Sequence, residues 1–178
     1  MRGLEKNNKG YSLVELIIVI AIIAVIGLGA TWSIILVFSA NAKTCANDLV
    51  SAISECKIMT MTKGQGNVRL ILYRDGENGA IYSKLQTKES PSAGWEDSKD
   101  GREKIGASKC TVTRIEDDGV TETSIPTSEG AAWEIYFDRS SGKLEDTSTV
   151  NNIHVLGGRK SYRVKIEKLT GKVTKELQ

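Results

Sequence analysis

The chain has 178 residues, a length that suits one folded domain together with an additional segment. Its 24 basic and 22 acidic residues leave a formal net charge of +2, which argues against a dedicated nucleic-acid-binding domain. The single histidine and three cysteines show no metal-ligand spacing, so neither a metal centre nor another cofactor is expected.

An uninterrupted apolar run near the N-terminus is the dominant feature. No charged side chain occurs from Leu16 to Ala42, and a helix needs roughly 20 apolar residues to cross a bilayer. A leader with Arg2, Lys6 and Lys9 precedes the run, and one acid, Glu15, lies at its edge. An unpaired carboxylate is costly in lipid, so Glu15 is expected to have a specific partner.

The stretch Gly10-Tyr11-Ser12-Leu13-Val14-Glu15, followed by the apolar run, resembles the class III leader and N-terminal segment of type IV prepilins and pseudopilins. The resemblance implies that a prepilin peptidase cleaves after Gly10, that Tyr11 is then N-methylated, and that Glu15 acts in assembly. Tyr11 departs from the family, which usually has phenylalanine at this position. The basic leader predicts a cytoplasmic N-terminus and an exported remainder. The mature chain would be formally neutral.

Burial suggests how Glu15 could act. In a filament core, its carboxylate would require a partner, and cleavage after Gly10 creates an amine at the same depth. We therefore expect Glu15 of one subunit to pair with the amino terminus of Tyr11 in a neighbour. The alternative is an acid at the edge of an ordinary membrane anchor.

From Asn41 onward the helical pattern becomes amphipathic. One stripe should pack on a sheet, and it comprises Cys45, Leu49, Ala52, Ile53, Cys56 and Met59. The segment Gly64-Gln65-Gly66-Asn67 is expected to end the helix.

The exported cysteines could form a disulfide. Cys45 and Cys56 would lie roughly 16 Å apart on one helix, beyond the roughly 7 Å limit between bridged Cα atoms. The feasible pairs are thus Cys56–Cys110, taken as the candidate disulfide, and Cys45–Cys110. The alternative is three buried thiols.

The remainder of the chain has the pattern of antiparallel strands. A hairpin is predicted from Val68–Tyr73 and Ala80–Leu85 around the turn Asp75–Gly79. A long polar loop is expected from Thr87 to Lys104, with Trp95 either packed on the domain or exposed for a partner. Further strands are predicted at Cys110–Ile115, Val120–Ile125, Trp133–Phe137, Ile153–Leu156, Ser161–Glu167 and Val173–Leu177.

This order predicts an α+β protein: a long N-terminal helix, with a membrane half and an amphipathic half, packed on a C-terminal antiparallel β-sheet domain. The expected divisions are a leader at 1–10, a transmembrane and filament-core helix at 11–40, and a globular domain at 41–178. The C-terminal half also resembles H-type minor pseudopilins of type II secretion and FimT-type minor pilins. That likeness rests on Ile135-Tyr136-Phe137-Asp138, Ser141-Gly142-Lys143-Leu144, Tyr162-Arg163-Val164-Lys165-Ile166 and Thr170-Gly171-Lys172-Val173.

Three features could carry other chemistry. Some FimT-type proteins take up DNA through basic C-terminal residues, which makes Arg159, Lys160 and Arg163 candidates for phosphate contacts, although a solvated sheet face explains them better. His154 lacks a catalytic constellation in the sequence and is expected to be a structural or surface residue. The acid pairs, Glu96-Asp97, Glu116-Asp117-Asp118 and Glu145-Asp146, lack calcium-ligand spacing and suit solvated turns.

These features predict a structural subunit, not an enzyme, of a type IV pilus or type II secretion system. Its expected partners are the prepilin peptidase, other pilin subunits and membrane lipid. Two alternatives are a DNA-binding minor pilin and a plain single-pass anchored surface protein.

Overall fold

The computed structural model describes residues 12–62, 67–90, 92–116 and 119–178, and excludes the side chains of 28–33, 67, 99 and 100. The chain divides into two compact units, Met1–Leu36 and Val37–Gln178. The proposed cleavage position between Gly10 and Tyr11 lies outside the described residues.

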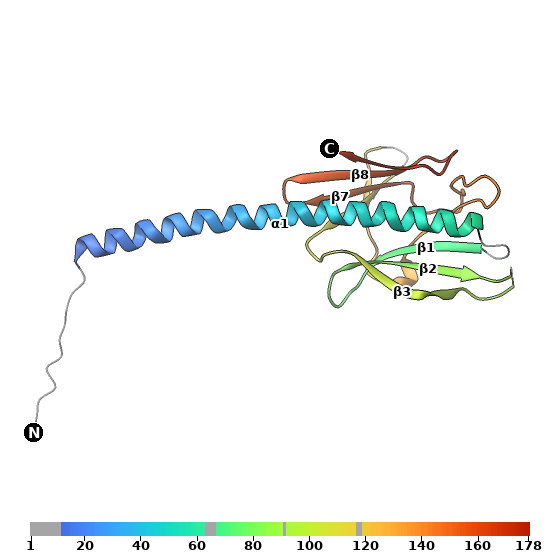
Figure 1. Cartoon of the computed structure of the whole chain (residues 1–178), viewed down its shortest axis with the longest axis horizontal. Helices are drawn as coiled ribbons and strands as arrows, with labels where there is room; N and C mark the ends of the chain where they lie inside the picture. Colours follow the sequence, from blue (N-terminus) through green and yellow to red (C-terminus); the bar gives the residue numbers. More distant parts are fainter. Residues whose placement is uncertain (1–11, 63–66, 91, 117–118) are drawn as a thin grey trace, which may run out of the picture. The chain divides into compact units, whose positions relative to one another are not determined.

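One long helix, α1, extends over Leu13–Thr62 (Figure 1). From Val37 onward it carries the predicted amphipathic stripe. Cys45, Leu49, Ile53 and Cys56 are buried, whereas Lys43, Ser51 and Glu55 are exposed. The predicted packing stripe is therefore confirmed.

A four-stranded antiparallel sheet follows, in the order β3-β2-β1-β6. Its strands are β1 (Asn67–Arg74), β2 (Ile81–Lys88), β3 (Glu96–Gly106) and β6 (Trp133–Tyr136). The predicted hairpin is confirmed, because β1 pairs with β2 from Asn67↔Lys88 to Arg74↔Ile81. The prediction of a long loop at 87–104 is wrong, because most of this segment forms the end of β2 and most of β3.

A second, five-stranded antiparallel sheet has the order β5-β4-β7-β8-β9. Its strands are β4 (Thr111–Ile115), β5 (Glu122–Ser124), β7 (Asn152–Gly157), β8 (Lys160–Ile166) and β9 (Val173–Leu177). A short 3-10 helix, η1 (Glu129–Ala131), precedes β6. Apart from β3, the strands were thus predicted within a few residues, but they form two sheets instead of one.

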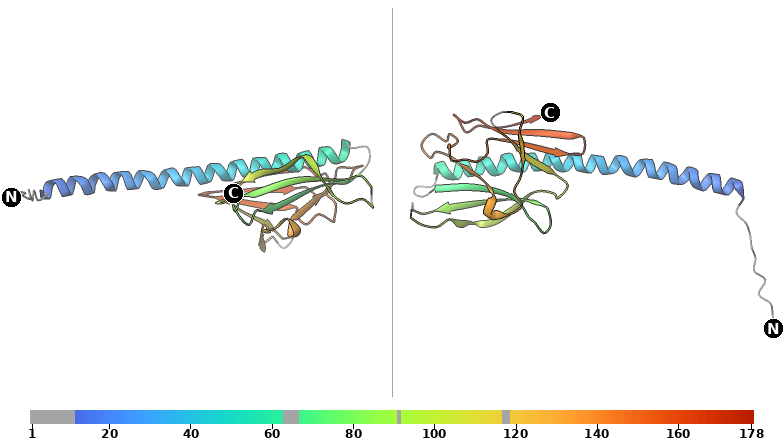
Figure 2. Two further views of the ribbon diagram at one scale, coloured as in Figure 1. Left: turned by 90° about the horizontal axis from the view of Figure 1, so that it is seen from below. Right: turned by 180° about the vertical axis from the view of Figure 1, so that it is seen from behind.

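Both sheets pack on the helix from Val37 onward. In Figure 1, β7 and β8 lie on one side of this part of α1 and β1–β3 on the other. The left view of Figure 2 shows both sheets beneath it. A single core joins α1 and the two sheets. Its largest fully buried side chains include Leu49, Ile53, Leu70, Leu72, Ile81, Ile135, Ile153, Val155 and Ile166.

Two turns with the same hydrogen-bond pattern meet at the C-terminal end of α1. In the turn 138–143, the N–H of Gly142 donates to the main-chain oxygen of Asp138. In the turn 167–172, the N–H of Gly171 donates to the main-chain oxygen of Glu167. Both glycines have φ near +60°, a conformation that favours glycine. A Cβ at Gly171 would also overlap the main-chain oxygen of Gly142, so the two turns are in direct contact.

Candidate functional site

The N-terminus of α1 is closed by a reciprocal pair of hydrogen bonds. The N–H of Glu15 donates to Ser12 Oγ over 3.2 Å, and the N–H of Ser12 donates to Glu15 Oε2 over 3.0 Å. This is a capping box, which satisfies two N–H groups that the helix itself leaves unpaired. Glu15 thus has a defined position at the start of the helix in the single chain.

The apolar side chains that follow Glu15 are uncovered in the single chain. Leu13 is 76% exposed and Ile18 is 52% exposed, and the other large apolar residues from Val14 to Ile26 have similar values. Soluble monomers rarely expose a contiguous apolar surface of this extent, which indicates a surface covered by lipid or by other subunits. Within the part of the chain that the structure describes, no helix is both long enough and apolar enough to cross a membrane.

Residues 6–31 match the family model described as the prokaryotic N-terminal methylation motif. This match supports a relation between the chain and type IV pilin-like proteins. This motif indicates processing by a prepilin peptidase, membrane anchoring and later association with pilin subunits in a filament. No curated protein and no solved structure matches the chain.

The three basic residues considered for DNA contacts lie in two different structural settings. Arg159 and Lys160 are exposed in the turn between β7 and β8. Arg163 lies within β8, opposite Glu176 of β9, and its Nε atom is buried without a hydrogen-bond partner. Because residues alternate faces along a strand, Lys160 and Arg163 lie on opposite faces of the sheet. The structure therefore does not gather the three into one row of phosphate contacts.

His154 takes part in a polar network that the sequence did not indicate. Its Nδ1 atom lies 3.1 Å from Glu122 Oε1, and its Nε2 atom contacts the hydroxyl of Ser161. Thr113 donates to Glu122 over 2.7 Å. This hydroxyl and, less strongly, the ring of His154 lower the pKa of Glu122.

The order carboxylate, imidazole and hydroxyl is that of a serine hydrolase triad. Such a triad also requires main-chain N–H groups or other donors that stabilise an oxyanion beside the nucleophile. Ser161 lies in β8, between β7 and β9, where main-chain N–H groups pair with neighbouring strands. We therefore interpret the network as a set of cross-strand contacts that orders this face of the sheet.

The cysteines lie in two environments, and all three are free and buried. An interaction between the neighbouring thiols of Cys45 and Cys110 raises the pKa of Cys45 and lowers the pKa of Cys110. Cys56 lies apart, with Sγ 3.9 Å from the main-chain oxygen of Ile135, and burial raises its pKa to about 12. Since Cys45 and Cys56 are roughly 16 Å apart along α1, the structure favours Cys45 over Cys56 as the partner of Cys110.

Trp95 packs on the outer face of the four-stranded sheet. The guanidinium of Arg69 lies 4.3 Å from the centroid of its ring, and the Tyr136 ring lies 6.0 Å away. Arg69 also forms a 2.6 Å ion pair with Glu134. Of the two roles considered for Trp95, these contacts support packing on the domain.

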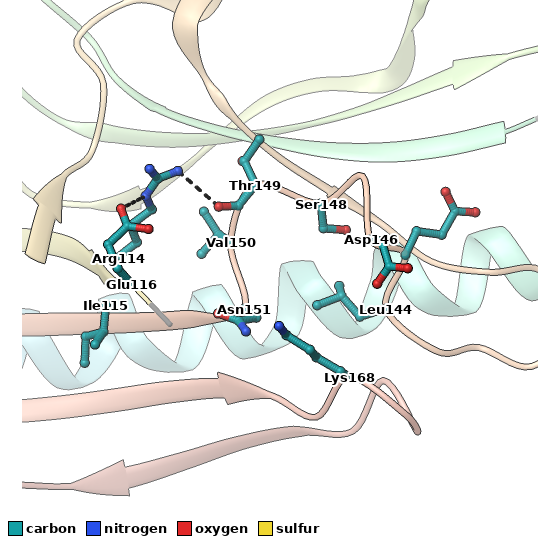
Figure 3. Close-up of a pocket in the computed structure, with 11 residues that line it drawn as sticks. Arg114, Ile115, Glu116, Leu144, Asp146, Ser148, Thr149, Val150, Asn151 and Lys168 are labelled. Atoms are coloured by element: carbon teal, nitrogen blue, oxygen red, sulfur yellow. Dashed lines mark hydrogen bonds and ion pairs between the residues drawn. The ribbon is translucent and has the colours of Figure 1, made fainter. Parts of the chain in front are cut away.

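A cavity of about 160 Å³ lies between the end of β4, the segment 144–151 and the turn after β8 (Figure 3). Arg114 lies on one side, where it donates to Glu116 over 2.7 Å and to the main-chain oxygen of Thr149 over 3.1 Å. Lys168 lies on the other side, and the predicted acid pair Glu145 and Asp146 contributes to the lining. The cavity is smaller than typical small-molecule sites, which begin at roughly 300 Å³. Among the described residues, no group of three potential ligands could hold a metal ion.

Proposed function

We propose that this chain is a structural subunit of a type IV pilus or type II secretion pseudopilus. The prepilin peptidase cleaves it after Gly10, and Tyr11 becomes the N-methylated terminus. The apolar segment first anchors the subunit in the cytoplasmic membrane and then packs against other subunits in the filament. The observation that supports this proposal most strongly is the uncovered apolar surface from Leu13 to Ile26, directly after the matched motif.

Glu15 is proposed to set the register between subunits. In the single chain, its Oε2 atom accepts the N–H of Ser12, which holds the carboxylate at the start of α1. A carboxylate fixed at this position can accept a hydrogen bond from the terminal amine of Tyr11 in a neighbouring subunit. The Glu15 side chain then loses little further conformational freedom on assembly. The capping box therefore supports an assembly role in addition to its effect on the helix.

The finer assignment is to a minor subunit of the H-type pseudopilin or FimT-type pilin kind. Two of the motifs behind this likeness, at Ser141-Gly142 and Thr170-Gly171, lie in the two turns that contact each other at the end of α1. Direct contact between these turns gives a structural reason for both glycines and supports the assignment. A DNA-binding role is not favoured, because Arg159, Lys160 and Arg163 lie in different settings.

The experiment is the intact mass of the protein recovered from cells that contain the prepilin peptidase. We expect the mass of residues 11–178 with one added methyl group. A Gly10→Val variant should keep the full-length mass, whereas the matched leader variant Gly3→Val should be processed normally. An unprocessed wild-type chain that works normally would refute the proposal. A plain anchored surface protein would show the full, uncleaved mass expected for each of the three chains.

A further inference from the structure

The turn between β7 and β8 docks closely against α1. A Cβ at Gly157 would lie 2.6 Å from the main-chain oxygen of Phe38 and 2.8 Å from the Cβ of Ala42. The N–H of Arg159 donates to Ser39 Oγ over 3.3 Å. The turn is therefore fixed to the helix segment Phe38–Ala42.

This helix segment is where the charge-free run ends. If the bilayer core takes up roughly 20 residues of the run, as the proposed function requires, its outer boundary falls near Leu36. Ser39 follows only three residues later in the same helix, which adds about 4.5 Å. The headgroup region is several Å deep, so Ser39 and the turn bound to it lie within its reach.

The charged residues of these two segments are all basic. Lys43 is exposed one helical turn after Ser39, and Arg159 and Lys160 are exposed in the turn. Neither the segment 37–46 nor the turn 157–160 contains an acidic residue. Leu156, directly before the turn, is 43% exposed and adds an apolar contact beside the cations.

We propose that the β7–β8 turn binds anionic phospholipid headgroups while the subunit is anchored in the membrane. The inference rests on the proposed function and adds a lipid contact for the globular domain. Basic side chains near an anionic surface are attracted by its potential, which decays within about 8–10 Å at physiological salt. A turn held against the membrane-exit segment of the helix keeps its cations within that distance.

The test uses the full chain in nanodiscs made of zwitterionic lipid alone or with added phosphatidylglycerol. A water-soluble amine-acetylating reagent is applied, and the acetylation rate of each lysine is read by mass spectrometry. We expect Lys160 to react about fivefold more slowly in the anionic discs, which corresponds to about 1 kcal/mol for one basic residue. Lys172, an exposed lysine near the end of the turn after β8, is the internal control and should react equally in both.

Two variants separate a specific contact from nearness to a charged surface. Arg159→Gln should remove most of the protection of Lys160, whereas Arg159→Lys should keep it. Arg139→Gln, at an exposed position in the turn 138–143, is the matched control and should change nothing.

Each other outcome has a distinct meaning. Equal Lys160 rates in the two kinds of disc, with the chain inserted, would overturn the lipid contact and leave the proposed function intact. Protection that persists in Arg159→Gln, or that extends equally to Lys172, would also overturn it. A chain that fails to enter nanodiscs at all would overturn the membrane anchor and this inference together.

Discussion

Oxidation should join Cys45 to Cys110 and leave Cys56 as a free thiol. The first two thiols are buried neighbours that shift each other's pKa in the folded protein, so we expect a bridge to form between them without unfolding. Oxidised glutathione supplies the oxidant: the new protein disulfide forms as the glutathione disulfide is reduced to two thiols.

The size of the effect follows from the loop that the bridge would close. A loop of about 65 residues gives a loss of unfolded-state entropy equivalent to about 4 kcal/mol at 25 °C. Because native contact between the thiols limits strain, most of this gain should appear as a higher free energy of unfolding.

The assay is urea unfolding of the full chain in detergent, before and after oxidation, combined with alkylation of the unfolded protein. The oxidised chain should take up one alkyl group and the reduced chain three. Cys56→Ala should oxidise normally and then take up none, whereas Cys110→Ser should not gain stability. Three reactive thiols after oxidation would show that Cys45 and Cys110 are not close enough to form a bridge, and would refute the prediction. Loss of the bridge in Cys56→Ala would refute it as well.

Three further changes test other parts of the structure. Gly157→Ala places a methyl group against Phe38 and should lower the free energy of unfolding by about 1–3 kcal/mol, whereas Gly130→Ala, with open space around its Cβ, should have little effect. Asp138 has a pKa of about 2, lowered from 3.8 chiefly by the hydroxyls and the N–H of the serines in its turn. Its folded-state pKa lies below the unfolded value, so its stabilising effect is present above about pH 4 and lost as the pH falls toward 2. Acid titration of the thermal midpoint should show this loss, and Asp138→Asn should remove that component. Ser12→Ala breaks the capping box and should weaken the first turn of α1 by about 1 kcal/mol, seen as faster amide hydrogen exchange there, while the unfolding of the globular part is unchanged.

The elements with a strong local pattern were predictable from the sequence. The stripe from Cys45 to Met59 has helical spacing, and the hairpin around Asp75–Gly79 has alternating apolar residues on both sides of a turn. Such signals need only neighbouring residues, which is why they could be read without knowledge of the fold.

Strand β3 was missed because its stability comes from distant partners. Its sequence, EDSKDGREKIG, is highly charged and lacks the alternation of a half-buried strand. In the structure, Asp97 pairs with Lys84 over 2.8 Å and accepts a hydrogen bond from Gln86 over 2.9 Å, both from β2. Charged residues are common on edge strands, where they prevent pairing with other chains.

The division into two sheets also depends on long-range pairing. β6 returns to pair with β1, through contacts such as Leu70↔Ile135, while the strands on either side of it in the sequence join the other sheet. Local patterns place each strand but do not specify its neighbour. The same limit applies to the cysteine pairing. Helical spacing excluded a bridge between Cys45 and Cys56, but it could not decide which of these two thiols lies next to Cys110.

The two parts of α1 differ in how their apolar side chains are distributed. From Val37 onward, one stripe of α1 is apolar, and the two sheets cover it. From Leu13 to Ile26, large apolar side chains point in all directions around the helix, and each is at least half exposed in the single chain. One sheet face cannot cover a surface of this kind, because covering it requires contacts from every side. Lipid provides such contacts in a membrane, and the same segments of other subunits provide them in a filament, so one continuous apolar surface can serve both states without refolding.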